Sequence, residues 1–256
     1  MAAVGPASGK PSPWDGRGIL QSGFSWFSGH AGDGQPHAHH AIQFLLAPEP
    51  QRIWTRVEGV NTLHGVVIKE QVEHQLFASE FPIDLLYVDP QSDFADRLRR
   101  LSDDPVIPIK AETVRRARRA LQTFRGSLDI DALIGCLVHR VGEPEVRHSK
   151  DLLMQQVMDA LHDFLPDPVS ASQLAAMANL SKDRFLHRFR QHAGLPLRPY
   201  LRWRRLQLAL EAVLSGKSLT DAAVLAGFSD AAHFTRTCRR HFGMAPSAFR
   251  ALRRPL

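Results

Sequence analysis

The sequence predicts an α+β protein in which a β-rich N-terminal part precedes an all-helical C-terminal part. From about Gly23 to Asp89 the chain consists of short segments rich in β-branched and aromatic residues, interrupted by Gly, Pro and Asn. Several short strands at such spacing are typical of a small β-sandwich or barrel. From Lys150 onward the apolar residues recur with a helical period instead. At 256 residues, 44% of them hydrophobic, the chain is long enough for two ordinary domains.

The N-terminal part begins with a Gly- and Pro-rich stretch, residues 1–19, in which we expect a flexible tail. Strands are expected after it, at Phe24–Phe27, Ala41–Ala47, Arg52–Val57, Gly65–Ile68, Gln75–Ala78 and Leu85–Val88. Three helices are expected next, at Ser92–Leu101, Lys110–Phe124 and Asp129–Val141. The second has an Arg-rich outer face, made by Arg115, Arg116, Arg118 and Arg119. The first domain is thus predicted at residues 20–145, followed by a linker at Glu143–Ser149.

The cysteine content and the distribution of apolar residues restrict the cellular setting. The two cysteines, Cys136 and Cys238, are too few for a disulfide framework or a four-thiolate zinc site. No apolar run approaches the ~20 residues needed to cross a bilayer, and the N-terminus lacks the pattern of a secretory signal. We therefore expect a soluble, reduced, cytoplasmic protein with no membrane partner.

The last third of the chain contains an internal repeat at a spacing of 48–49 residues. The stretch Ser172–Ser181 corresponds to Thr220–Ser229, and matching Phe, Arg, His and Gly positions follow each copy. Each copy has a short apolar helix, a turn with Asn or Gly, a Ser able to cap, and a second helix that ends at Gly. This order predicts a helix-turn-helix unit that occurs twice.

Local sequence signals support the helix boundaries in both copies. Ser170 followed three residues later by Gln173 matches a capping box. Further signals are caps at Ser181 and at Ser229 or Asp230, left-handed turn residues at Asn179 and Gly227, and helix stops at Gly194 and Gly243. Between the copies, Arg198–Leu214 predicts one continuous helix that separates the two units by a fixed distance.

The second helix of each copy has an apolar face and a polar face. Phe185, Phe189, Phe234 and Cys238 form the apolar side and are expected in the core. The other face carries Lys182, Asp183, Leu186, His187 and Arg190 in the first copy, and Ala231, Ala232, Thr235, Arg236 and Arg239 in the second. Small and polar residues flanked by Arg suit a helix in the major groove of DNA. A helical repeat that binds another protein is the alternative.

The charge distribution favours a polyanionic partner over that alternative. Net charge is +6, but residues 166–256 contain 15 Lys and Arg against 5 Asp and Glu, whereas residues 1–165 contain 17 against 21. Positive charge concentrated on one part of a chain is typical of nucleic-acid binding. An Arg-rich solvated surface would give the same composition, so the helix-turn-helix pattern carries the interpretation.

Residues 150–254 resemble the DNA-binding domain of the AraC/XylS family of bacterial transcription regulators. The resemblance is carried by Leu180–Gly194, Arg205–Leu214 and above all by the run Ala226–Arg250. It implies a seven-helix domain with two helix-turn-helix units joined by a long helix. The family's base-reading positions fall on Asp183, Leu186, His187, Ala231, Ala232, Thr235 and Arg236. Cys238 stands where the family usually has a large apolar residue, and Asp183 suits a groove only if it accepts from a cytosine amino group.

The N-terminal part is similar, more loosely, to the family's cupin-like effector domain. His37–Gln43 resembles the first cupin motif, and Gly65 to His74 the second. Metal-binding cupins use two His, a carboxylate and a later His, but Gln43 stands where Glu would be expected. We therefore expect no metal and no cofactor; His37, His39 and His74 would hold an ion if one binds. The candidate effector-binding residues are Trp26, His37, His39, Gln43, Trp54 and His74.

Together these observations predict a non-enzymatic regulator that binds double-stranded DNA and responds to a small-molecule effector of unknown identity. The resemblance also implies RNA polymerase as a partner and a homodimer formed through Asp129–Val141 or Lys110–Phe124, either of which could equally pack on its own sheet. The main alternative is a metal-binding cupin sensor or enzyme fused to a DNA-binding domain. An alkyl-transfer repair protein that uses Cys136 is a weaker alternative, because the spacing around that residue does not fit.

Overall fold

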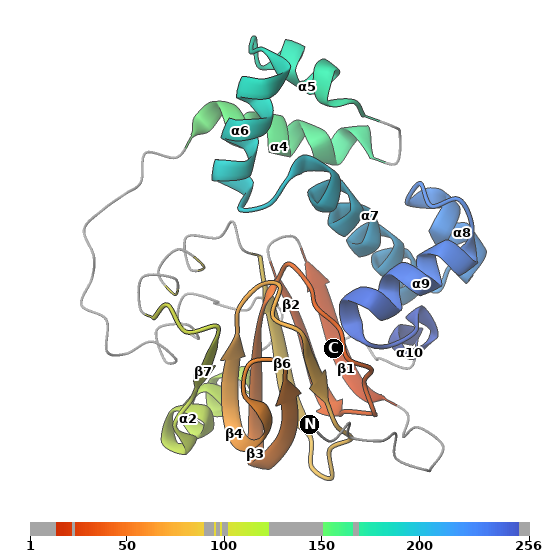
Figure 1. Cartoon of the computed structure of the whole chain (residues 1–256). Helices are drawn as coiled ribbons and strands as arrows, with labels where there is room; N and C mark the ends of the chain where they lie inside the picture. Colours follow the sequence, from red (N-terminus) through yellow and green to blue (C-terminus); the bar gives the residue numbers. More distant parts are fainter. Residues whose placement is uncertain are drawn as a thin grey trace.

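The computed structural model describes residues 14–21, 24–89, 95, 98, 102–122, 151–165 and 169–250. The features predicted at residues 1–13, Asp129–Val141, Cys136 and Glu143–Ser149 lie outside these ranges. Of the helix expected at Ser92–Leu101, only Ala95 and Leu98 are described, and both are helical. Figure 1 shows the two parts of the molecule, with a sheet formed by the first and a group of helices formed by the second.

The N-terminal part is one antiparallel sheet. Its strands are β1 (Asp15–Gln21), β2 (Phe24–His30), β3 (Ile42–Thr55), β4 (Gly59–Ile68), β5 (His74–Leu76), β6 (Ile83–Val88) and β7 (Val106–Pro108). They lie in the order β1-β2-β6-β3-β4-β7, and β5 pairs with β3. The strands expected at Ala41–Ala47 and Arg52–Val57 are the two halves of β3, whose register with β4 shifts between Leu46 and Gln51. The expected β-rich part is confirmed, and β7 adds a short strand that was not predicted.

Strand β1 corrects the prediction that the flexible tail extends to residue 19. Gly16 and Gly29 pair directly across β1 and β2, and a Cβ atom at Gly16 would lie only 2.4 Å from the carbonyl oxygen of Ser28. Glycine is required here by the close approach of two backbones. Trp14, just before the strand, is buried and packs edge-on against Phe27, with ring centroids 5.2 Å apart.

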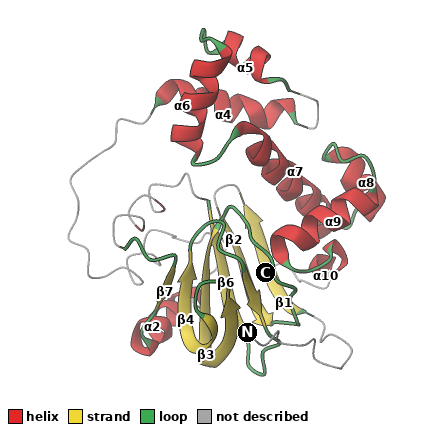
Figure 2. Ribbon diagram, viewed as in Figure 1, coloured by secondary structure: helices red, strands yellow, loops and turns green. Residues whose placement is uncertain are grey.

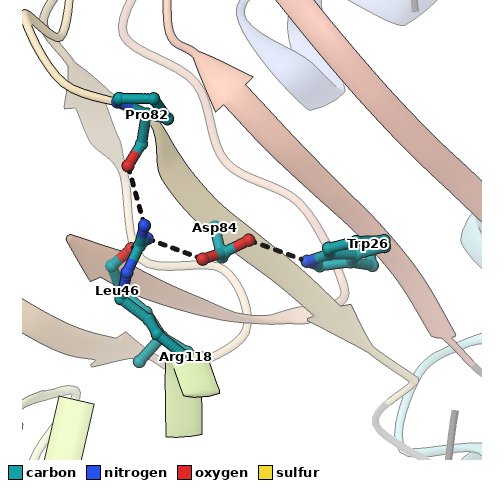
Figure 3. A network of polar contacts seen from close by, with 5 residues as sticks. All are labelled: Trp26, Leu46, Pro82, Asp84 and Arg118. Atoms are coloured by element: carbon teal, nitrogen blue, oxygen red, sulfur yellow. Dashed lines mark hydrogen bonds and ion pairs between the residues drawn. The ribbon is translucent and has the colours of Figure 1, made fainter. Parts of the chain in front are cut away.

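One face of the sheet is covered by α2 (Ala111–Gln122). Apolar side chains of α2 join a core with residues of β2, β3, β4 and β6: Val114, Ala117 and Leu121 with Phe24, Trp26, Phe44, Val67 and Leu86. Arg118 does not belong to a solvated face as predicted. Its guanidinium donates to the carbonyl oxygens of Leu46 at 2.7 Å and Pro82 at 3.0 Å and forms a 2.6 Å ion pair with Asp84 (Figure 3). Arg115 and Arg119 are exposed as expected.

The C-terminal part consists of seven described helices (Figure 2). They are α4 (Leu152–Phe164), α5 (Ala171–Met177), α6 (Lys182–Ala193), α7 (Leu197–Leu214), α8 (Leu219–Leu225), α9 (Ala231–Phe242) and α10 (Pro246–Arg250). This arrangement confirms the predicted all-helical part and the long helix between the two units. At 18 residues, α7 is ~27 Å long.

The two helical units have different cores. Helices α4, α5 and α6 form their own core with the start of α7, and Phe185, Phe189 and Tyr200 belong to it. Helices α8 and α9 instead share one continuous core with the second face of the sheet, in which Phe234 and Phe242 lie in the same cluster as Leu45 and Leu85. Figure 1 accordingly shows α4 to α6 apart from the sheet and α9 and α10 beside it.

Candidate nucleic-acid interface and ligand site

The first helix-turn-helix unit is formed by α5 and α6. Ser170 and Gln173 make the predicted capping box at the start of α5. Asn179 adopts a left-handed conformation (φ 55°) in the turn, and the Ser181 hydroxyl caps α6 by accepting from the backbone N–H of Arg184. Gly194 (φ 72°) ends α6 in a left-handed conformation. Local chemistry thus fixes the ends of both helices at the predicted residues.

The second unit, α8 and α9, repeats this construction. Gly227 (φ 72°) occupies the turn. Of the two cap candidates, Asp230 is the one used: its carboxylate accepts from the backbone N–H of His233 at 2.6 Å. The same contacts lower the pKa of Asp230, because the His233 N–H stabilises the charged carboxylate. Gly243 (φ 68°) ends α9.

The predicted outward faces of α6 and α9 are accessible. In α6, Lys182, Asp183, His187 and Arg190 are exposed and Leu186 is half-buried; in α9, Ala232, Arg236 and Arg239 are exposed, and Ala231 and Thr235 are half-buried. The opposite faces are buried as predicted, with Phe185, Phe189 and Phe234 at 0% exposure. Arg188 is turned away from the outward face of α6 and forms an ion pair with Asp151, the cap of α4. The contacts of the ten outward residues with DNA remain predictions.

A second candidate site lies in the sheet, where three buried imidazoles meet. His37 and His74 face each other across an isolated bridge, and His39 lies just before β3. The ring centroids are 4.4 Å apart for His37 and His74, 5.0 Å for His39 and His74, and 5.6 Å for His37 and His39. One ligand atom from each lies within 4.8 Å of the other two. We call these three residues the histidine cluster.

Each imidazole of the cluster is oriented by a backbone carbonyl. The Nδ1 atom lies 2.8 Å from the carbonyl oxygen of Gln35 in His37, of Ala41 in His39 and of Val72 in His74. The side-chain oxygen of Gln43 lies 2.9 Å from Nε2 of His39 and 3.0 Å from Nε2 of His74. Within the described part of the chain, Nε2 of His37 is buried and has no hydrogen-bond partner.

Burial keeps the histidine cluster neutral. It lowers the pKa of His37 to about 3 and that of His39 to about 4, and it lowers the pKa of His74 well below 6.5. The neighbouring imidazoles act in the same direction on His37 and His74, because adjacent positive charges would repel. Neutral imidazoles are the form that binds metal ions and accepts hydrogen bonds.

Two of the predicted effector-binding residues do not join the cluster. Trp26 belongs to the core on the α2 side of the sheet, where its indole N–H donates to Asp84 at 3.2 Å. Ile53 lies in the core on the face of the sheet away from α2. Successive residues of a strand point to opposite faces, so Trp54 points to the α2 side, like Trp26. His37, His39, Gln43 and His74 remain as the group that the structure brings together.

The histidine cluster lies next to the end of α9, a contact that sequence reasoning missed. The backbone N–H of Gln35 donates to the carbonyl oxygen of Gly243 at 3.1 Å. A Cβ atom at Gly243 would lie 2.7 Å from Nδ1 of His37 and 2.7 Å from the carbonyl oxygen of Gln35. Rings also meet nearby, with Tyr87 edge-on to Phe242 at 5.7 Å. No short-range signal identifies such a contact, because its partners are some 200 positions apart in the sequence.

Comparisons with known proteins identify the helical part. Residues 174–252 match a family model described as a helix-turn-helix domain. The transcriptional activator RhaS of Enterobacter sp. (strain 638) is 34% identical over 116 residues, which cover 44% of this chain and 41% of RhaS. The probable transcriptional regulator LumQ of Photobacterium leiognathi is 27% identical over 128 residues, 48% of this chain and 50% of LumQ. The C-terminal part of the chain therefore contains a helix-turn-helix domain, and it is similar in sequence to bacterial transcriptional regulators. The chain spans half or less of the length of these relatives.

Structural likeness extends beyond the helix-turn-helix domain to the sheet. ToxT from Vibrio cholerae superposes with a TM-score of 0.59 at 10% identity, over 90% of this chain and 97% of that chain. A second ToxT structure, solved with an unsaturated fatty acid bound, has a TM-score of 0.57 at 9% identity. At this identity the likeness concerns the fold, and it confirms a cupin-like sheet followed by a helix-turn-helix domain.

Two further findings concern Cys238 and the described helices. Cys238 is fully buried in α9 and unpaired, and burial raises the pKa of its thiol. It is therefore a core residue, as expected, and not a reactive thiolate. Among the residues that the structure describes, no helix has the length and apolar character needed to cross a bilayer.

Proposed function

We propose that this chain is a sequence-specific, DNA-binding transcriptional regulator of the AraC/XylS type whose N-terminal domain responds to an effector. One observation carries the proposal: two helix-turn-helix units present exposed polar faces on α6 and α9, and α7 joins them. Two DNA-reading helices on one side of a duplex must lie ~34 Å apart to enter successive segments of the major groove. The length of α7, ~27 Å, together with the width of the two units is of that order.

We assign base contacts to the central outward positions and phosphate contacts to the flanking cations. Arg236 is the strongest candidate, because an exposed guanidinium can bind the O6 and N7 atoms of guanine. Ala231, Ala232 and Thr235 permit close approach and can contact a thymine methyl group. In the first unit, Asp183, Leu186 and His187 hold the corresponding positions. Lys182, Arg190 and Arg239 are assigned to phosphates.

The remaining assignments follow from this function. We propose a cytoplasmic, non-enzymatic protein with a sensor domain from Trp14 to about residue 145 and the AraC-type domain at 150–254. Relatives named as transcriptional activators support RNA polymerase as a second partner. The apolar side of α2 is occupied by the sheet, so we assign the homodimer contact to the helix predicted at Asp129–Val141.

The effector is assigned to the face of the sheet opposite α2. Buried polar side chains gather there, namely those of His37, His39, Gln43 and His74. A ToxT structure with an unsaturated fatty acid bound supports a small-molecule ligand for a protein of this fold. A buried polar group in an otherwise apolar face is typical of a ligand site, because burial is costly without a binding partner.

The function is tested by selecting DNA from a random pool with the full chain. We expect an enriched sequence with two half-sites about one helical turn apart, bound with an affinity that falls steeply as salt rises, because bound phosphates release counterions. The absence of any enriched sequence, or binding that does not depend on salt, would contradict the proposal. Repeating the selection with and without candidate metabolites tests the response to an effector.

A further inference from the structure

We propose that the histidine cluster and the side-chain oxygen of Gln43 bind a divalent transition-metal ion, and that this ion is the effector of the second helix-turn-helix unit. The second half of the proposal rests on the regulatory function proposed above, whereas the metal site does not. One ring nitrogen from each of the three buried histidines lies within 4.8 Å of the other two, and Oε1 of Gln43 lies against Nε2 of His39 and His74. We take Nε2 as the ligand atom of His37 as well, because its Nδ1 contacts the carbonyl oxygen of Gln35.

The hydrogen bonds of the cluster set the tautomer of each ring. Because a backbone carbonyl can only accept, each Nδ1 that lies 2.8 Å from such an oxygen must carry the proton. The proton-free lone pair is then on Nε2 in all three rings. A metal-binding histidine usually donates its other ring N–H to a carbonyl or a carboxylate, which fixes the ring and raises its basicity. The cluster has this arrangement three times.

With these tautomers, the centre of the cluster contains acceptors that face acceptors. The lone pairs of His39 and His74 point at the oxygen of Gln43, from 2.9 Å and 3.0 Å. If the amide is turned round, its NH₂ group can donate to those two nitrogens. Nε2 of His37 is then still without a donor among the described residues, although it is buried. One cation at the centre satisfies all four atoms.

The ligand types indicate which cations fit. Three imidazole nitrogens and one amide oxygen suit Zn²⁺, Co²⁺, Ni²⁺, Cu²⁺ or Fe²⁺, whereas Mg²⁺ and Ca²⁺ prefer sites made of oxygen. Tetrahedral Zn²⁺ has ligands at about 2.0–2.1 Å, which places ligand atoms roughly 3.4 Å apart. The three ligand atoms lie within 4.8 Å of one another. Metal binding is therefore expected to draw the rings together.

The contact with α9 gives that movement a consequence. His37 and His74 exchange two backbone hydrogen bonds of 2.9 Å, so the two move as a pair. The segment Gln35–His37 lies against Gly243 through a backbone hydrogen bond of 3.1 Å. Gly243 ends α9, whose outward face carries Arg236. A shift of His37 toward the ion therefore changes the contact between Gln35–His37 and Gly243, on which the end of α9 rests. Since coupling between two sites is reciprocal, DNA binding should change the affinity for the metal by the same factor.

The metal site is tested with untagged full chain that has been treated with a chelator. Titration with Co²⁺ alone, followed by visible absorption, and with Zn²⁺ alone, followed by calorimetry, should each give one ion per chain. His37→Ala and His74→Ala should weaken binding by at least about 100-fold. Gln43→Glu should strengthen it about tenfold or more, because a carboxylate is the better ligand. The control His30→Ala changes an exposed histidine of the same domain and should have no effect.

If the histidine cluster is only hydrogen-bonded and binds no metal, the opposite results are expected. The unmodified chain would then take up no stoichiometric Co²⁺ or Zn²⁺. This result alone would contradict the proposed metal site, whatever the alanine variants do. Gln43→Glu would then lower the midpoint of thermal unfolding, and Zn²⁺ would not restore it. If the site exists, Zn²⁺ should raise that midpoint for both the unmodified chain and the glutamate variant.

The regulatory half is tested on the DNA sequence selected above. Zn²⁺ should change the affinity of the full chain for that sequence by about 5- to 150-fold, and His74→Ala should remove the change. Metal uptake without any change in DNA affinity would overturn the effector role and leave the site intact. If no DNA sequence is bound in either state, the proposed function fails, and the metal stoichiometry still decides the site.

Discussion

Buried neutral histidines make the stability of this chain depend on pH. His37 and His39 have pKa values lowered by burial to about 3 and about 4, against an ordinary value of 6.5. They remain neutral in the folded chain and take up protons on unfolding. A falling pH therefore stabilises the unfolded state relative to the folded state. Their contribution is fully present above pH ~6.5 and is lost as the pH falls from there toward 4, by about 1.4 kcal/mol per pH unit for each imidazole.

Urea unfolding at pH 7.5 and pH 5 in the presence of a chelator measures this dependence. We expect a lower free energy of unfolding at pH 5, and the same difference in the His30→Ala control. Equal stability at the two pH values would mean that the cluster is open to water, in contradiction to its burial.

Arg236 is the outward residue from which we expect the clearest effect on DNA recognition. It is exposed on α9 and lies one helical turn beyond the small residues Ala231 and Ala232. Arg236→Ala should cost about 1–3 kcal/mol on the selected DNA sequence and relax the preference at one base position. Arg119→Ala, which removes an exposed charge from α2, serves as the control and should change the affinity little. A uniform loss over all sequences would instead identify Arg236 as a phosphate contact.

A buried ion pair links α2 to the sheet in addition to their shared apolar core. The side chains of Arg118 and Asp84 are 12% and 4% exposed, and the guanidinium also donates to two carbonyl oxygens (Figure 3). Removal of one partner of a buried pair leaves an uncompensated charge and typically costs about 3–5 kcal/mol. We therefore expect Arg118→Ala to lower the free energy of unfolding by about that amount at pH 8, and Arg119→Ala to change it by less than about 0.5 kcal/mol.

The pH dependence of this loss provides a second check. Burial raises the pKa of Asp84, although the neighbouring Arg118 acts in the opposite direction. Without Arg118 the carboxyl group takes up a proton more readily, which removes the buried charge. The loss in urea unfolding should therefore be smaller at pH 5 than at pH 8, and a loss that is equal at both would show that the charge of Asp84 is not its cause.

Gly243, at the end of α9, is expected to tolerate substitution less well than Gly216, which also has a left-handed backbone conformation. Gly243 and Gly216 both have positive φ, 68° and 88°, and a Cβ costs roughly 1–2 kcal/mol in that region. A Cβ at Gly216 meets nothing within 4 Å, whereas one at Gly243 meets Gln35 and His37 at 2.7 Å. Gly243→Ala should therefore destabilise the chain by about 1–3 kcal/mol more than Gly216→Ala in urea unfolding. Equal losses would contradict the close contact between α9 and the sheet.

The sequence predicted those elements whose determinants lie close together in the chain. The capping box at Ser170 and the helix stops at Gly194 and Gly243 involve neighbours a few residues away, so they could be recognised. Strand β1 was missed because Gly16 is explained only by its partner Gly29 across the sheet. Arg118 could not be told from the exposed arginines around it, because its ion-pair partner Asp84 lies 34 positions earlier in the sequence.

The candidate site divides in the same way. Helical periodicity sufficed to predict which residues of α6 and α9 face outward. The three histidines were recognised by their resemblance to the cupin motifs. Their contact with Gly243 was not predicted, because it depends on how the two parts of the chain pack. The side of the sheet on which Trp26 lies follows from its pairing with Leu86 and not from its own neighbours in the chain, so the sequence could not show that Trp26 lies apart from the histidine cluster.

The two helix-turn-helix units, though alike in sequence, differ in what stabilises them. Phe185 and Phe189 lie in a core formed by α4 to α7 alone, whereas Phe234 lies in the core that includes the sheet. Any change in the sheet is therefore expected to reach α9 and to spare α6. If the proposed function is correct, a ligand bound at the sheet is expected to act on α9 and to leave α6 unchanged.

Hydrogen exchange of the full chain can test this asymmetry with two matched substitutions. Leu45→Ala removes a fully buried side chain of β3, and Leu174→Ala removes one of α5; both leucines are 0% exposed. Each substitution should cost about 2–5 kcal/mol in its own core. Leu45→Ala should speed exchange in the sheet and in α8 and α9 but not in α6, because only the former share its core. Leu174→Ala should speed exchange in α5 and α6 and leave the sheet unchanged. If Leu45→Ala left α9 as protected as before, the shared core could not transmit a signal from the histidine cluster to the DNA.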